Sequence, residues 1–345
     1  MSKQTMNIAF SSDDNGVEMM LVAIFSIMKN HQPENFDIKI FIMQSGLSEE
    51  SLCKIDRLEE SFSNLTLKHL IVKKAQFSKL ELPNSQWWIS QQAYYRYILP
   101  DLLPKDSKVL YLDIDMLCCG DIGLLYSTNI SSYYFAAIPD YFIESGYGRW
   151  SGFKSAVGLK KSDTYINSGV LLMNLEKIRQ DNKVQEFLYN AGKNRHNLIS
   201  KEHDYFVDQT IANLTFQTAI KVLSYEWNAM IHNYSHIKKA PKLLHFAGSH
   251  KPFTYTDTNP EVTECMDKYL DTYIECMATI HGVGREDNQM LKKRMKDLSG
   301  QITAQQAELE NLKRISTKID DVYSSYSWRV TKPLRKLSSF MRKKT

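Results

Sequence analysis

The chain has 345 residues, of which 43% are hydrophobic, so it is long enough to bury a large core. Its five cysteines are odd in number and match no metal-knuckle spacing, which excludes a disulfide-rich secreted scaffold and favours a reducing compartment. No apolar run approaches the roughly 20 residues that a membrane-spanning helix needs, and the net charge of +4 is unremarkable for the whole chain.

Strand and helix patterns alternate through the first part of the chain. Residues 7–11, 36–44 and 65–72 have the apolar patterns of buried strands, while residues 17–30 have the length and composition of a helix. A second helix is predicted directly after Ser48, whose hydroxyl suits an N-cap. This alternation predicts an α/β fold with a mainly parallel sheet flanked by helices.

Two polar features in this part have two interpretations each. Asp13 and Asn15 follow the first strand, where they suit hydrogen bonds to a base and a ribose, but turn and helix-cap chemistry explains them equally well. Residues 89–99 form a predicted aromatic helix with Arg96 as its single cation. An exposed arginine there would be unremarkable, whereas a buried one would need an anionic partner.

The next strand leads into a pair of carboxylates. Residues 109–112 form a short apolar run, and Asp113 and Asp115 follow it two positions apart. A turn at Ile114 would aim both carboxylates into the crevice at the carboxyl end of the strand, where open α/β sheets bind ligands. Adjacent carboxylates repel each other unless a cation lies between them, so the pair favours Mn²⁺ or Mg²⁺ bridging to phosphate oxygens. The alternative is a strand that ends in a solvated acidic turn.

Two further strands are predicted over residues 134–139 and 165–174. Asn167 and Ser168 lie at the mouth of the second strand, followed by Gly169. Glycine within a strand indicates either the close approach of a ligand to the backbone or a bulge.

The residues around these strands are predicted to form a loop and two helices. Residues 141–158 have the aromatic and glycine-rich composition of a loop, which suits stacking on a sugar or simple packing at the surface. Residues 184–193 and 203–213 are predicted helices, and the second carries Asp208 and Gln209 at its centre. A buried pair of this kind would need polar partners.

A last short strand over residues 242–245 ends in His245, and Gly248 and Lys251 follow within six positions. This segment offers a metal ligand, a flexible backbone and a cation for phosphate. A histidine that ends a strand is more often structural, so the segment by itself leaves both roles open.

The pattern changes near the C-terminus. Apolar residues recur at a spacing of three and four from Leu291 to Ile319, which predicts either a coiled coil of roughly four heptads or a helix packed back on the domain. Residues 322–345 contain seven basic and no acidic residues, together with aromatic side chains. This composition favours attachment to an anionic membrane surface, and although nucleic acid would also accept such a tail, nothing else in the chain resembles a nucleic-acid module.

Five motifs of the chain, taken in order, resemble those of the family 8 retaining glycosyltransferases, above all the bacterial lipopolysaccharide galactosyl- and glucosyltransferases with a GT-A fold. The motifs are F-S-S-D-D-N, Y-L-D-I-D, Y-I-N-S-G-V-L-L-M-N-L, D-Q and H-F-A-G-S-H-K-P-F, and they span residues 6–253. Phe253 departs from the tryptophan that many members carry. We therefore expect a GT-A domain over residues 1–283, a helical or coiled-coil segment over 284–322 and a membrane-associating basic tail over 323–345.

The resemblance also implies roles for individual residues. Asp113, Asp115 and His245 would bind Mn²⁺ or Mg²⁺, which would bridge both phosphates of a UDP-sugar. Arg96, Asp208 and Gln209 would be catalytic candidates beside the sugar, and the donor would contact Asp13, Asn15, Asn167, Ser168, Gly248 and Lys251.

The implied function is retaining transfer of glucose or galactose from a UDP-sugar to a cell-surface glycan or glycolipid. The enzyme would be cytoplasmic and peripheral on the inner face of the membrane, with a possible homo-oligomer through the coiled coil and no nucleic-acid partner. Because the amide of Gln209 is a poor nucleophile, front-face (SNi-like) attack is favoured over double displacement. Two alternatives are a sugar nucleotidyltransferase, and a coiled-coil scaffold that binds nucleotide or glycan without turnover.

Overall fold

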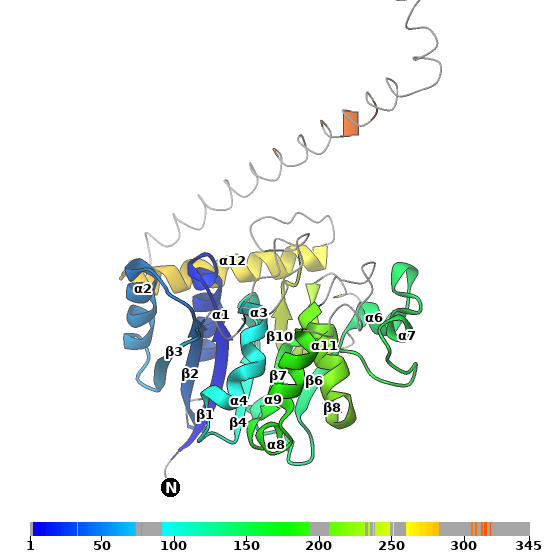
Figure 1. Cartoon of the computed structure of the whole chain (residues 1–345). Coiled ribbons are helices and arrows are strands. Elements are labelled where there is room, and N and C mark those ends of the chain that lie inside the picture. The colour runs from blue at the N-terminus through cyan, green and yellow to red at the C-terminus, as the bar shows by residue number, and fades with distance from the viewer. Residues whose placement is uncertain are drawn as a thin grey trace, which may run out of the picture.

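A mixed sheet runs through the centre of the described part of the chain, with helices on both of its faces (Figure 1). The computed structural model describes residues 3–32, 34–73, 77, 92–192, 207–231, 234, 237, 239–248, 251 and 260–282, together with residues 305, 308, 312, 314, 315 and 318.

The large sheet has seven strands in the order β3-β2-β1-β4-β7-β6-β8. Neighbouring strands are parallel except in the two pairs that involve β7. A second, three-stranded sheet has the order β5-β10-β9. The strands are β1 (Gln4–Ser11), β2 (Phe36–Gln44), β3 (Leu65–Ile71), β4 (Lys108–Leu112), β5 (Met116–Cys118), β6 (Phe135–Pro139), β7 (Ile166–Asn174), β8 (Ile220–Val222), β9 (Ala229–Met230) and β10 (Leu243–His245). The predicted α/β class with a mainly parallel sheet is confirmed.

The helices cover the two faces of this sheet. They are α1 (Val17–Asn30), α2 (Glu49–Glu60), α3 (Gln92–Tyr95), α4 (Leu99–Leu102), α5 (Gly123–Tyr126), α6 (Tyr141–Ser145), α7 (Phe153–Ala156), α8 (Leu175–Gln180), α9 (Lys183–Ala191), α11 (Val207–Phe216) and α12 (Pro260–His281). Helices α1, α2 and α12 share one hydrophobic core with the sheet, and α4, α8, α9 and α11 share another.

Side chains alternate between these two cores along each strand. In β4, Leu110 and Leu112 belong to the core under α1, whereas Val109 and Tyr111 belong to the core on the opposite face. Because successive side chains of a strand point to opposite faces, a sheet covered on both sides needs apolar residues at every position. This requirement explains why the central strands appear in the sequence as continuous apolar runs.

Most predicted elements are confirmed, with small differences at their ends. The predicted strands correspond to β1, β2, β3, β4, β6, β7 and β10, and three of the predicted helices correspond to α1, α2 and α9. Ser48 caps α2, since its hydroxyl accepts a hydrogen bond from the N–H of Ser51 at 3.3 Å. The described part of the helix predicted over 203–213 is α11, which begins at Val207.

The prediction of one continuous helix over 89–99 is wrong for the part that the structure describes. The short helices α3 and α4 are separated there by a 3-10 turn, Arg96–Ile98. Pro100 has no N–H to donate to the carbonyl of Arg96, and the N–H of Leu99 bonds to that carbonyl instead. The tighter turn that results interrupts the helix.

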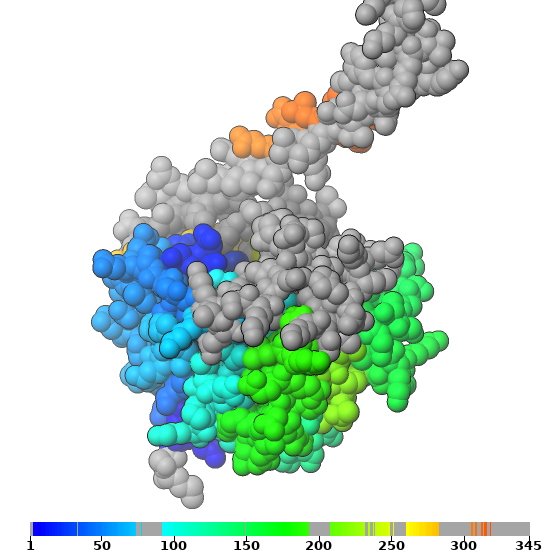
Figure 2. Space-filling model, viewed as in Figure 1, coloured from blue at the N-terminus to red at the C-terminus, as the bar shows by residue number. Residues whose placement is uncertain are grey.

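The prediction of an irregular loop over 141–158 is also wrong. This segment contains α6, a 3-10 turn and α7, and Figure 2 shows it projecting at one edge of the molecule. Trp150 and Phe153 pack with Ile143 and Tyr165 in a small separate core. Trp150 and Phe153 therefore hold the segment together, whereas Tyr147 is exposed.

No element is predicted for the residues of α12, although this helix packs across α1 and α2 (Figure 1). Its buried side chains include Cys265, Tyr269 and Cys276. The buried face also includes Val262, Leu270, Ile274 and Ile280, so apolar residues at helical spacing are the sequence signal that identifies this helix.

The predicted coiled coil and basic tail lie outside the described residues, apart from six helical positions. Of these positions, Leu312 is 56% exposed and Ile315 is 44% exposed. Among the described helices, none combines the length and the apolar character that crossing a membrane requires.

Candidate metal and donor site

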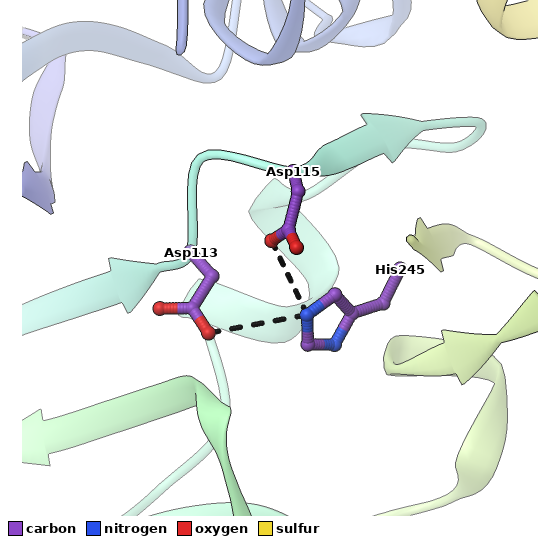
Figure 3. A group of neighbouring side chains, drawn as sticks. All are labelled: Asp113, Asp115 and His245. Atoms are coloured by element: carbon purple, nitrogen blue, oxygen red, sulfur yellow. Dashed lines mark ion pairs between the residues drawn. The ribbon is translucent and has the colours of Figure 1, made fainter. Parts of the chain in front are cut away.

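Strand pairing brings Asp113, Asp115 and His245 to one point (Figure 3). The chain turns at Ile114 between β4 and β5, so both carboxylates lie on this turn. Strand β10 pairs antiparallel with β5 in a register that places His245 opposite Met116. Nε2 of His245 lies 3.3 Å from Oδ1 of Asp115 and 3.9 Å from Oδ2 of Asp113.

The donor atoms of this cluster suit a divalent cation. Each of the three residues offers one ligand atom, and these atoms lie within 4.8 Å of one another. Two bonds of roughly 2.0–2.4 Å to one ion hold their ligand atoms up to about 4–5 Å apart, so the spacing fits. Carboxylates suit Mg²⁺ and Mn²⁺, and imidazole suits first-row transition metals, so Mn²⁺ satisfies both ligand types.

Lys251 provides a positive charge beside Asp115. Its ammonium group bonds to Oδ2 of Asp115 and donates to the carbonyl of Phe246 at 3.1 Å. Burial raises the pKa of Asp115, but the charges of Lys251 and His245 outweigh this effect and hold that pKa well below its usual range. Gly248 has a φ of 69°, a left-handed conformation that favours glycine and turns the chain between β10 and Lys251.

The two carboxylate oxygens of Asp113 have different partners. Its Oδ1 accepts a hydrogen bond from the hydroxyl of Tyr111 at 2.9 Å and pairs with Arg96 at 3.0 Å, which leaves Oδ2 toward His245. The guanidinium of Arg96 is buried and lies 4.4 Å from the ring centre of Tyr111. Burial lowers the pKa of Arg96, but the charge of Asp113, together with the neighbouring tyrosines and Asp208, outweighs this effect and holds that pKa above its usual range. Arg96 is therefore the buried arginine with an anionic partner.

Strand β7 bulges beside the cluster. Ala137 of β6 pairs with Leu171, but the next β6 residue, Ile138, pairs with Asn167. Residues 168–170 consequently bulge out of the β6 pairing. A glycine at this strand mouth indicated either a bulge or the close approach of a ligand, and the structure shows a bulge.

Gly169 lies in the bulge and leaves room for the side chains of the cluster. Its carbonyl accepts the N–H of Asp113 at 2.9 Å. A Cβ atom at Gly169 would lie 2.6 Å from Cε1 of His245 and 2.9 Å from Oδ2 of Asp113. Both separations are too short for a side chain, so glycine is required here by the approach of the cluster.

Buried side chains hold the bulged backbone from both sides. Arg96 donates to the carbonyl of Ser168 at 2.6 Å, and Oε1 of Gln209 accepts the N–H of Ser168 at 2.9 Å. Nε2 of Gln209 donates to Asp140 at 3.1 Å. Burial raises the pKa of Asp140, although hydrogen bonds from Asn167 and Gln209 oppose the shift. The side-chain amide of Gln209 thus links the backbone of Ser168 to Asp140.

Asp208 is buried near Arg96 at the start of α11. Burial raises the pKa of this carboxyl group, while the charge of Arg96 opposes the increase. The charge of Asp113 also raises the pKa of Asp208, so the two carboxyl groups interact electrostatically, and both interact with the charge of Arg96.

His245 is held from its other side by amide groups. Its Nδ1 lies 2.7 Å from Oδ1 of Asn228, and Nδ2 of Asn228 donates to Oδ1 of Asn167 at 2.8 Å. Nδ2 of Asn167 donates in turn to Asp140 at 3.3 Å. Together with Gln209 and Arg96, these contacts make a closed ring of polar groups around the cluster.

The polar turn after β1 lies against the turn that carries the two carboxylates. A Cβ atom at Gly16 would lie 2.5 Å from Cδ1 of Ile114. Oδ1 of Asp13 accepts the N–H of Gly16 at 3.2 Å and caps the 3-10 turn Asp14–Gly16, while Asn15 is exposed. Helix-cap chemistry is therefore present at Asp13, and contact with a base is untested.

The structure gathers most of the predicted site residues around one point. They are Arg96, Asp113, Asp115, Asn167, Ser168, Asp208, Gln209, His245 and Lys251. Gly248 lies on the connecting turn, and residues 249, 250, 252 and 253 of the last motif lie outside the described residues.

Sequence reasoning missed two residues of this network. Asp140 follows β6 directly, so the rule that ligands gather at the carboxyl ends of parallel strands would have found it. Asn228 lies between a 3-10 turn and the two-residue strand β9, and no sequence pattern distinguishes it.

The chain is similar to known glycosyltransferases. The family model described as glycosyl transferase family 8 matches residues 7–257. A Haemophilus influenzae protein named as a glycosyltransferase is 30% identical over 225 residues, which are 65% of this chain and 63% of that relative. The lipopolysaccharide 1,2-glucosyltransferase of Escherichia coli K12 is 27% identical over 269 residues, which are 73% of this chain and 74% of the relative.

A solved structure has the same fold. The galactosyltransferase LgtC, in complex with donor and acceptor sugar analogs, superposes with a TM-score of 0.63 and 22% identity over 78% of this chain and 95% of its own. This likeness identifies the GT-A fold. The family match runs from β1 past His245 and Lys251, and so includes every strand of the large sheet and all the residues of the cluster. The chain belongs to glycosyl transferase family 8.

Proposed function

We propose that this glycosyltransferase is a divalent-metal-dependent, retaining hexosyltransferase. It transfers glucose or galactose from a UDP-sugar to a glycan or glycolipid acceptor of the cell surface. The observation that carries the proposal is the convergence of Asp113, Asp115 and His245 on one point, with Lys251 beside them. Two acids, an imidazole and an ammonium group suit a cation and the diphosphate that it would bridge.

The named residues have distinct tasks in this proposal. Asp113, Asp115 and His245 would hold Mn²⁺ or Mg²⁺, and Asp13, Asn15 and Gly248 would bind the nucleotide. A bound ion supplies Lewis-acid stabilisation of the charge that develops on UDP. Lys251 adds a second positive charge at the leaving phosphate, so departure needs no protonated acid.

Retention of configuration follows from front-face attack. The acceptor hydroxyl oxygen bonds to the anomeric carbon on the face from which UDP leaves, while the bond from that carbon to the phosphate oxygen breaks. A phosphate oxygen of the leaving UDP takes the hydroxyl proton, so no protein base is required. Arg96, Asn167 and Asp208 would position the sugar.

The surroundings of Gln209 support this route over a double displacement. Its Oε1 already accepts hydrogen bonds from the N–H and, at 3.4 Å, from the hydroxyl of Ser168, and its Nε2 donates to Asp140. An amide oxygen is a weaker nucleophile than a carboxylate, and these bonds draw its electron density away from the sugar. We therefore assign Gln209 to positioning and to electrostatic support of the anomeric carbon.

The decisive experiment is a screen of UDP-sugars with Mn²⁺, read as UDP release with and without a lipid-linked glycan extract. The unmodified protein should release UDP only when metal is present. Asp115→Ala and His245→Ala should lower this rate at least 100-fold and weaken UDP binding, because each removes a ligand. Asp121→Asn is a suitable control, since Asp121 accepts the N–H of Gly123 outside the cluster.

Several outcomes would contradict the proposal. Release of pyrophosphate from UTP would instead identify a nucleotidyltransferase. Tight UDP binding without transfer to any acceptor would identify a binding protein without turnover. Unchanged metal and UDP affinity in both alanine variants would show that the ion, if any, binds elsewhere.

We also propose that the basic tail over 323–345 attaches the enzyme to anionic membranes from the cytoplasm, near a membrane-bound acceptor. Each basic residue close to an anionic surface contributes about 1 kcal/mol, and the tail carries seven. The full chain should sediment with vesicles that contain anionic lipid, and a chain ending at residue 326 should not. Equal sedimentation of the two chains, or sedimentation with neutral vesicles alone, would exclude this role for the tail.

A further inference from the structure

The ring nitrogen of His245 that points away from the carboxylates has a buried partner. Nδ1 of His245 lies 2.7 Å from Oδ1 of Asn228, and Asn228 is completely buried. Asn228 directly precedes β9, which pairs in parallel with β10 so that Ala229 lies opposite Leu244. The backbone pairing therefore keeps the amide beside the imidazole.

A chain of hydrogen bonds fixes which atom of this amide faces the histidine. The N–H of Gly169 can only donate, and it bonds to Asn167 at 2.9 Å, so the accepting atom of Asn167 is its Oδ1. That same oxygen lies 2.8 Å from Asn228, which must present its Nδ2 group to it. The oxygen of Asn228 is then the atom that faces His245.

This orientation determines where the imidazole carries its proton. An amide oxygen only accepts hydrogen bonds, so Nδ1 of His245 must be the donor. In a neutral imidazole with its proton on Nδ1, the lone pair lies on Nε2. Nε2 is the atom that faces Asp113 and Asp115. The opposite tautomer would direct a proton at Asp115 and occupy the place of a cation.

We propose that Asn228 is a positioning residue of the metal site, which holds the Nδ1 proton of His245 so that Nε2 is available as a ligand. The assignment deepens the proposed function and rests on it, since it presumes that His245 binds a cation. Partners of this kind on ligating histidines typically change metal affinity 10–100-fold when they are removed. Oδ1 of Asn167 accepts hydrogen bonds from both Asn228 and Gly169, so the bulge of β7 helps to orient Asn228.

The position of the proton can be measured without any metal. In protein labelled with ¹⁵N-histidine, long-range ¹H–¹⁵N spectra at about pH 8, where free histidine is neutral, distinguish protonated from unprotonated ring nitrogens. The signals of His245 are those that disappear in His245→Gln. We expect a protonated Nδ1 in the unmodified protein. An unprotonated Nδ1 would overturn the proposal, whatever the variants show.

The affinity of Asn228 variants for Mn²⁺ then separates a positioning role of Asn228 from a merely structural one. Each variant is titrated with Mn²⁺ alone, and the paramagnetic signal of free Mn²⁺ measures binding. Asn228→Ala removes the acceptor and should weaken binding at least tenfold. Asn228→Asp keeps an acceptor for Nδ1 and should stay within about threefold of the parent protein, although it loses the bond to Asn167. Asn7→Ala, which removes a buried asparagine bonded to Asp106, should leave Mn²⁺ affinity unchanged.

The outcomes can be told apart. Equal Mn²⁺ affinity of Asn228→Ala and Asn228→Asp, whether both weak or both like the parent, would show that the acceptor at Nδ1 is irrelevant and would overturn the proposal. If the unmodified protein binds neither Mn²⁺ nor Mg²⁺, the proposed function fails, and the tautomer measurement still decides whether Asn228 orients His245.

Discussion

Gly169 sets how closely Asp113 and His245 approach the sheet. Its missing side chain lets Asp113 and His245 approach the backbone of β7, and its own carbonyl and N–H bond to Asp113 and Asn167. The residue therefore combines a packing requirement with two hydrogen bonds at one place. Its neighbours in the bulge are held by Arg96 and Gln209, so the backbone has little freedom to make room.

A methyl group at Gly169 should damage the site directly. In Gly169→Ala, either His245 or Asp113 must move, and overpacking of this kind costs about 1–3 kcal/mol of unfolding free energy. We expect at least a tenfold weaker affinity for Mn²⁺, measured by titration, together with a lower urea midpoint.

Gly120→Ala is the matched control for this substitution. The nearest atom to a Cβ at Gly120 is a side-chain carbon of Lys242 at 3.4 Å, which is ordinary contact with a flexible chain. Its effect on unfolding should stay within about 0.5 kcal/mol. The interpretation of Gly169 is wrong if the two variants lose stability and Mn²⁺ affinity to the same extent.

At the scale of elements, α12 supports both the core and the segment that carries His245. Tyr269 of α12 packs edge-to-face on Phe246, which directly follows His245, at 4.9 Å between ring centres. The same helix contacts α1 and α2. A helix that is distant in sequence thereby packs against the end of β10, where His245 of the candidate site lies.

Glu18 joins α1, α2 and α12 and makes their packing dependent on pH. Its carboxylate pairs with Lys54 of α2 at 2.9 Å and accepts the hydroxyl of Tyr273 of α12 at 2.8 Å. Burial raises the pKa of Glu18, but these partners outweigh it and lower the pKa below its usual value of 4.5. A lowered pKa means that the ionised group stabilises the fold above that value, and that the contribution is lost as pH falls through the folded-state pKa.

Glu18→Gln should therefore be less stable than the parent near pH 7 by about 0.5–1 kcal/mol, a small value because water screens the partly exposed pair. The difference should shrink as the pH falls below 4.5 and through the lowered folded-state pKa, because the carboxylate then becomes protonated in the folded protein as well. Urea unfolding of both proteins at a series of pH values from 7 downward measures this difference in unfolding free energy.

Glu275→Gln serves as the comparison at the same helix contact. Its pair with Lys29 is exposed, so we expect a change near zero at neutral pH. A difference between the parent and Glu18→Gln that stays constant or grows on acidification would contradict the assignment.

At the scale of the molecule, α12 is the last element in the sequence that contributes buried residues to the described core. We propose that residues 1–283 form a domain that folds alone. Tyr269, Cys276 and Ile280 of this helix are buried in the core that α1 shares with the sheet. A chain ending at residue 283 should keep cooperative unfolding and metal-dependent UDP binding. A chain ending at residue 257, where the family match stops, should fail to fold, since each lost apolar side chain removes about 1.5–3 kcal/mol of burial energy.

Circular dichroism, urea unfolding and UDP binding of both chains test this boundary. Cooperative folding of the shorter chain would show that α12 is dispensable. Loss of folding in the chain that ends at residue 283 would show that the following segment belongs to the domain. That result would favour the alternative in which the helix from Leu291 to Ile319 packs back on the domain.

The sequence by itself determined the class of fold and most residues of the candidate site. Apolar runs of strand length, separated by helical segments, specify a covered sheet, because backbone hydrogen bonding and burial act on each segment locally. Asp113 and Asp115 were found because they follow such a run directly. The same rule reaches Asp140 after β6.

Only the tertiary structure decided how distant residues complete that site. Lys251 and Asp115 are 136 positions apart and meet through the pairing of β10 with β5, a register that no local pattern contains. The burial of Arg96 and the orientation of His245 by Asn228 likewise depend on neighbours from separate elements. The apolar pattern of each segment determines whether it forms a strand or a helix. The positions of side chains around a shared point follow instead from how those strands and helices pack.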